Sequence, residues 1–157
     1  MNVPYSVHEI NPFCIQAMAE HRALRGSFAS IKGLLNKAAE SDADKRAALA
    51  EVAGKISQFQ AALTDHFRRE ERGGCLEEAV IRSPALAPEA DRLLAEHVEL
   101  SDMVEQLRAD AAGSISPAEA WHKLAADYAQ FEVYWLRHEA AEDSLLQKAF
   151  NEDFGNS

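Results

Sequence analysis

Four long segments of the chain place apolar residues at alternating spacings of three and four, which is the pattern of a helix with one buried face. The segments are predicted at residues 13–38, 44–72, 89–112 and 117–150. Ser116-Pro117-Ala118-Glu119 has the form of a capping box with proline at the first helical position. A short additional helical piece is expected at 75–82. The chain is therefore predicted to be all-α.

Short connections join the first segment to the second and the third to the fourth, which favours an antiparallel up-down four-helix bundle. With 157 residues, the chain is long enough to form one domain with its own core. We expect a single domain over 1–157 that begins with a short N-terminal arm.

Six of the inward positions hold polar side chains that a buried helix face normally excludes. They are His21, His66, Glu70, His97, His138 and Glu142. Glu70 and Glu142 each follow a histidine by four residues, so each pair lies one turn apart on one face. Because a buried carboxylate without a partner is costly, four nitrogens and two carboxylates indicate a pair of metal ions. Iron or manganese suits this mixed ligand set best, and zinc is an alternative.

The two halves of the chain repeat one another. AEHRAL at 19–24 and AEHVEL at 95–100 lie 76 residues apart, and the two His-x-x-x-Glu pairs lie 72 residues apart. At a rise of about 1.5 Å per residue, these offsets bring all four histidines to a similar depth in the bundle. The pattern indicates a duplicated helical hairpin.

The remaining composition excludes several classes of partner. The net charge is −10 and there is no basic run, so nucleic acid is not an expected partner. No segment approaches the roughly 20 apolar residues of a membrane helix, and the first residues lack the pattern of a secretory signal. We therefore expect a cytoplasmic protein with Cys14 and Cys75 as free thiols. His8 and His122 are expected at or near the surface.

The chain resembles the hemerythrin-like, or HHE cation-binding, family over about residues 10–150. The ligand order that carries the resemblance is His21, His66-x-x-x-Glu70, His97 and His138-x-x-x-Glu142. The resemblance implies a non-haem di-iron centre in which the first two histidines bind one iron and the last two bind the other. Both glutamates would bridge the irons, together with an oxo or hydroxo group or water.

Oxygen-carrying hemerythrins have a further histidine one turn after the third-helix ligand and an aspartate as the last bridge, where this chain has Ser101 and Glu142. Solvent, Tyr134 or Glu96 are candidates for the position that the missing histidine leaves. This pattern is closer to di-iron proteins that repair iron–sulfur clusters and to bacterial HHE sensors or peroxide-handling proteins.

The predicted function is binding of, or reaction with, O₂, peroxide or NO, and a catalase-like or other oxidoreductase activity stays open. The alternatives are iron handling or sensing, iron–sulfur cluster repair, and a metal-free structural or interaction bundle. Four apolar residues flank the ligand layer and are expected to exclude bulk water from it: Leu24, Leu63, Leu100 and Trp135. No catalytic residue and no oligomeric state is assigned.

Overall fold

The computed structural model describes residues 12–37, 42–113 and 116–150, and within these ranges it contains helices and no strand. The elements are α1 (Pro12–Leu35), α2 (Asp42–Glu71), α3 (Cys75–Arg82), a 3-10 turn η1 (Pro84–Leu86), α4 (Ala87–Ala111) and α5 (Pro117–Phe150). The predicted antiparallel four-helix bundle is confirmed, and α3 is the short piece expected at 75–82. The predicted N-terminal arm, with His8, lies outside the described residues.

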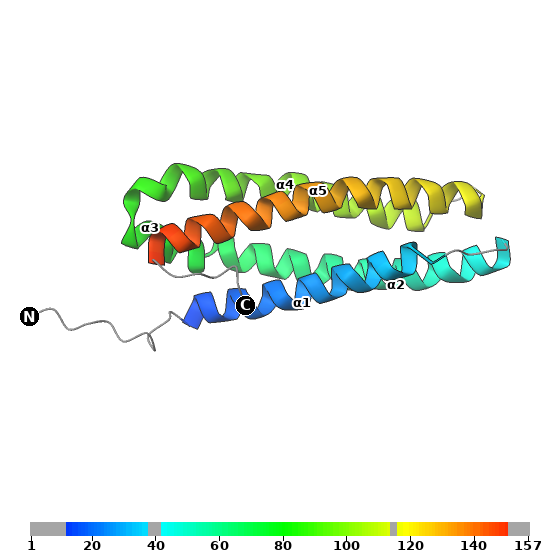
Figure 1. Cartoon of the computed structure of the whole chain (residues 1–157), viewed down its shortest axis with the longest axis horizontal. Coiled ribbons are helices and arrows are strands. Elements are labelled where there is room, and N and C mark those ends of the chain that lie inside the picture. Colours follow the sequence, from blue (N-terminus) through cyan, green and yellow to red (C-terminus); the bar gives the residue numbers. More distant parts are fainter. Residues whose placement is uncertain (1–11, 38–41, 114–115, 151–157) are drawn as a thin grey trace, which may run out of the picture.

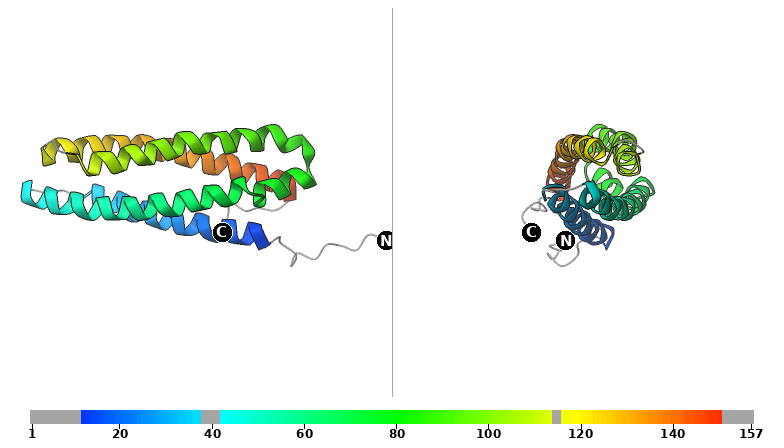
Figure 2. Two further views of the ribbon diagram at one scale, coloured as in Figure 1. Left: turned by 180° about the vertical axis from the view of Figure 1, so that it is seen from behind. Right: turned by 90° about the vertical axis from the view of Figure 1, so that its right-hand side faces the viewer.

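The four long helices lie side by side, and α3 connects α2 to α4 at one end of the bundle (Figures 1 and 2). The opposite end carries the start of α5, where the Ser116 hydroxyl accepts a hydrogen bond from the Glu119 backbone N–H at 3.3 Å. This bond satisfies a helix N-terminal donor as the capping-box sequence predicts. Across the bundle, Lys32 of α1 pairs with Glu132 of α5 at 2.9 Å.

The interior consists of two apolar clusters separated by a polar layer. The larger cluster includes Leu24, Phe59 and Trp135, and the smaller one, at the α3 end, includes Ala17, Leu93 and Leu145. The six predicted ligand residues are buried between these clusters. The bundle therefore interrupts its apolar core at one level, where the sequence places the histidines and glutamates.

The expectation of two free thiols is wrong. Cys14 in the first turn of α1 and Cys75 at the start of α3 form a disulfide, with their Cα atoms 4.8 Å apart. The turn at Gly73 and Gly74 brings Cys75 back toward α1, and Gly73 has a φ of 95°, a conformation that glycine adopts readily. Both cysteines are buried in the smaller apolar cluster.

Among the described residues, the long helices are also too polar to cross a membrane, because none contains a sufficiently long apolar stretch.

Candidate metal centre

All six predicted ligand residues meet at one level of the bundle. His21 comes from α1, His66 and Glu70 from α2, His97 from α4, and His138 and Glu142 from α5. Each is at most 5% exposed. The helical spacing of four within α2 and α5 points the histidine and the glutamate of each helix into the same space.

The first half of the centre is formed by the two histidines of the α1–α2 hairpin. The Nε2 atoms of His21 and His66 lie 2.9 Å apart. Oε1 of Glu70 lies 2.8 Å from Nε2 of His66, and Oε1 of Glu142 lies 3.4 Å from Nε2 of His21. One ligand atom from each of these four residues falls within 4.8 Å of the others, close enough to surround one cation.

The second half is formed by the two histidines of the α4–α5 hairpin. Oε2 of Glu70 lies 3.0 Å from Nε2 of His97, and Oε2 of Glu142 lies 3.6 Å from Nε2 of His138. Ligand atoms of Glu70, His97 and His138 form a second group within 4.8 Å. Each carboxylate therefore presents one oxygen to the first histidine pair and the other oxygen to the second pair, which is the geometry of a bridge.

Three of the histidines donate a hydrogen bond from their outer nitrogen to a glutamate of a neighbouring helix. Nδ1 of His66 lies 2.5 Å from Oε2 of Glu20, and Nδ1 of His138 lies 2.7 Å from Oε2 of Glu96. Nδ1 of His97 lies 3.1 Å from Oε1 of Glu71. A proton on Nδ1 leaves the lone pair of Nε2 facing the centre, so these glutamates set the tautomer that a metal requires.

In a comparison with protein-family models, the chain matches the hemerythrin HHE cation-binding domain over residues 16–150. The chain belongs to this family. Searches of curated proteins and of solved structures each found no significant match.

The buried polar atoms of this HHE domain are better arranged to bind a cation than to hydrogen-bond to one another. Within the described part of the chain, both carboxylate oxygens of Glu70, Oε1 of Glu142 and Nε2 of His97 and His138 are buried without a hydrogen-bond partner. Oε2 of Glu70 and Nε2 of His97 approach to 3.0 Å, and the ligand atoms form two groups that could each hold a metal ion. Buried acceptors in this state are costly unless a cation or water joins them.

Glu70 and Glu142 have opposite electrostatic environments. Burial alone raises the pKa of Glu70, but the close imidazole groups of His21, His66 and His97 outweigh it and hold the pKa well below its usual value. Burial, together with the negative charge of Glu70, raises the pKa of Glu142 well above its usual value. Without a metal, therefore, Glu70 ionises more readily than Glu142.

The pKa values of His66 and His138 are shifted in opposite directions, again by burial and by neighbouring carboxylates. Burial lowers the pKa of His66, yet the nearby carboxylate of Glu70 and the hydrogen bond to Glu20 more than offset this effect and leave the pKa raised. Burial dominates at His138 and lowers its pKa despite the hydrogen bond to Glu96. A lowered pKa keeps the imidazole neutral, which is the form that binds metal.

Two of the candidates for an additional ligand lie away from the converging atoms. Glu96 contacts the outer nitrogen of His138, and Tyr134 packs against the larger apolar cluster with the Arg137 guanidinium 5.7 Å from its ring centre. Ser101 is half-buried one turn after His97, and His122 is exposed, as expected.

The sequence reasoning missed Phe67 and the roles of Glu20 and Glu71. The Phe67 ring stacks on His97 with 3.8 Å between ring centres and fixes the orientation of that imidazole. Leu24, Leu63, Leu100 and Trp135, which were expected to shield the site, are each at most 2% exposed. For Glu20 and Glu96 a signal existed, because each directly precedes a ligand histidine in the repeated Ala-Glu-His motif.

Proposed function

We propose that this HHE domain holds two iron ions and binds, or reacts with, a small ligand such as O₂, peroxide or NO. The observation that carries the proposal is the position of Glu70 and Glu142, each of which faces both histidine pairs with separate oxygens. Four imidazole nitrogens and two carboxylates suit iron, and manganese is the nearest alternative. Iron held in this way supplies a redox change and coordination positions that the protein does not fill.

The six predicted ligands and the residues around them would have different roles in this site. His21 and His66 would hold one ion, His97 and His138 the other, and the two glutamates would bridge the ions. Glu20, Glu71 and Glu96 keep the outer nitrogens protonated, so the inner nitrogens stay available. The apolar residues on the Trp135 side of the layer limit contact with bulk water.

Reaction or sensing is favoured over stable oxygen carriage. Ser101 stands where oxygen carriers have a further histidine, so each ion would be held by only two imidazoles. We propose that solvent takes the remaining position, because Tyr134 and Glu96 contact other groups. A site that is completed by exchangeable solvent opens readily to an incoming ligand.

Metal analysis combined with absorption spectroscopy tests this proposal. The protein is reduced without oxygen, loaded with Fe²⁺, freed of excess metal and then exposed to air. About two irons per chain and new near-ultraviolet absorption are expected, since the site has two groups of ligand atoms. A folded chain that retains no metal would refute the proposal and favour the structural bundle. The decay of added peroxide then separates a catalase-like enzyme from a sensor or carrier.

Iron handling is the second candidate, and the buried unpaired oxygens and nitrogens favour it. These atoms destabilise the metal-free fold, so iron availability would change the stability of the whole domain. A rapid and complete release of iron to a chelator under reducing conditions would support this role over ligand chemistry.

The partner that we propose is a small ligand, and we propose no binding to nucleic acid or to a membrane. The cytoplasmic location stays a prediction, and the Cys14–Cys75 disulfide favours an oxidising compartment instead.

A further inference from the structure

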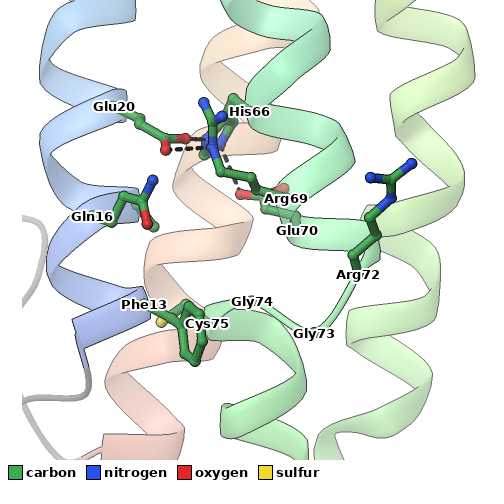
Figure 3. Close-up of a pocket in the computed structure, with 11 residues that line it drawn as sticks. Phe13, Gln16, Glu20, His66, Arg69, Glu70, Arg72, Gly73, Gly74 and Cys75 are labelled. Carbon is green, nitrogen blue, oxygen red and sulfur yellow. Dashed lines mark hydrogen bonds and ion pairs between the residues drawn. The ribbon is translucent and has the colours of Figure 1, made fainter.

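A pocket of about 180 Å³ connects the protein surface to one side of the proposed metal centre. It lies between the start of α1, the last turn of α2 and the Gly73–Gly74 turn (Figure 3). Two of the predicted ligands, His66 and Glu70, form part of its lining. A second pocket lies at the opposite end of the bundle, around Leu49 and Pro117, and is lined by none of the six ligands.

The internal repeat explains why the centre is open on this side. Ala17, Gly73 and Gly74 line the pocket. With the offsets of 76 and 72 residues, their counterparts in the second half are Leu93, Leu145 and Leu146. All three leucines are at most 3% exposed and pack in the smaller apolar cluster. The second half thus continues α5 with buried leucines in the smaller apolar cluster, whereas the first half ends α2 at a glycine turn that borders the pocket.

Two further features fix the walls of the pocket. A Cβ on Gly74 would lie 3.1 Å from the carbonyl oxygen of Arg69, so the turn packs against α2 through bare backbone. The disulfide ties Cys75, which lines the pocket, to the first turn of α1. A cavity of this size is below the roughly 300 Å³ of pockets for drug-sized ligands, and it has ample room for a small ligand, since a cavity of about 150 Å³ already accommodates benzene.

The ion pair between Arg69 and Glu20 lies on the solvent side of His66 in this pocket. Nε of Arg69, whose side chain is 49% exposed, lies 2.6 Å from Oε1 of Glu20. The other oxygen of Glu20 accepts the hydrogen bond from His66. Figure 3 shows Glu20, Arg69 and His66 gathered on one side of the pocket, with Cys75 and the glycine turn on the other. The repeat places Ala141 at the position equivalent to Arg69, so the second half lacks an arginine at this position.

We propose that this pocket is the access route by which small ligands reach the metal centre, and that the Glu20–Arg69 pair is its gate. The nearly symmetric centre is then reached from the His66 side, and the second half is sealed by leucine. The inference rests on the proposed function and adds the residues that control access to it.

The test compares Ala17→Leu, which introduces the leucine of position 93, with Ala23→Leu as the matched control. Ala23 is exposed on the same helix and lies outside the pocket. Both proteins are loaded with iron, oxidised in air and mixed with azide, and binding is followed by stopped-flow absorbance. Because a blocked route changes rates and not the final complex, association and dissociation should both slow by about tenfold or more at an unchanged Kd. Arg69→Ala should accelerate both rates.

Several results would overturn the inference. Equal azide rates in Ala17→Leu and Ala23→Leu, at equal iron content, would remove the access route and leave the proposed function intact. A changed Kd with an unchanged association rate would likewise refute a gating role. If Ala17→Leu fails to retain iron, Gln16→Trp at the exposed rim is compared with Ile15→Trp beside it, and equal rates in that pair overturn the inference. A wild-type chain that binds no metal would overturn the proposed function, and the access route with it.

Discussion

Replacing Glu142 by glutamine should stabilise the metal-free protein and weaken metal binding. Glu142 is 1% exposed, and its pKa is raised well above the usual value by burial and by the charge of Glu70. Above its usual pKa of 4.5, the folded metal-free protein must take up a proton at this carboxyl group or tolerate two adjacent charges. Glutamine has nearly the same shape and avoids both costs.

The magnitude follows from proton linkage. A group whose pKa is raised on folding contributes stability that is fully present below its unfolded value and is lost as the pH rises. Each pH unit costs about 1.4 kcal/mol, so holding the proton at pH 7 costs up to about 3 kcal/mol relative to a pKa of 4.5. We expect Glu142→Gln to recover part of this amount at pH 7 and to have little effect at pH 4.

Glu70→Gln is the matched control, because it makes the same change at the other bridging position. The pKa of Glu70 is lowered by the three histidines close to it, so its charge stabilises the fold above pH 4.5 and the variant should lose stability there. Urea unfolding followed by circular dichroism at pH 4 and pH 7, with and without Fe²⁺, measures both variants. The reasoning is refuted if Glu142→Gln destabilises the metal-free protein at pH 7 as much as Glu70→Gln does.

Three further changes test other parts of the structure. His66→Ala should lower metal affinity at least tenfold, because a ligand is removed, whereas His122→Ala at an exposed position should leave the metal content unchanged. Reducing the disulfide between Cys14 and Cys75, 61 residues apart, should cost about 4 kcal/mol of unfolding free energy, and equal urea midpoints with and without reductant would contradict this. Tyr128→Phe removes the 2.6 Å hydrogen bond from its hydroxyl group to a backbone carbonyl of α1 and should cost about 1 kcal/mol, measured by the same unfolding method.

The ligand layer could be predicted from the sequence because helical periodicity alone decides which side chains face inward. His66 and Glu70 lie one turn apart whatever the surrounding fold, and the repeat places His138 and Glu142 at the same depth. The same periodicity predicted the bundle and its helices. That these six residues bind metal stays a prediction, although the structure brings them together.

The features that periodicity could not predict depend on contacts between helices. Glu20 reaches His66 because α1 and α2 adopt one particular rotation about their axes, which spacing along one helix does not determine. The disulfide depends on the path of the chain through Gly73, which returns Cys75 to α1. The pocket forms where the small residues Ala17, Gly73 and Gly74 come together in the fold. Spacing along a single helix does not predict that these three residues meet.

The Cys14–Cys75 bond encloses His21, His66 and Glu70 in one covalent loop. When the oxidised protein denatures, these three donors stay tethered at a high effective concentration, so the denatured state retains some affinity for metal. Affinity for the denatured state subtracts from the stabilisation that metal gives to the native state. The rise in Tm on adding iron should therefore be larger for the reduced protein than for the oxidised one, although both native states present the same six ligands.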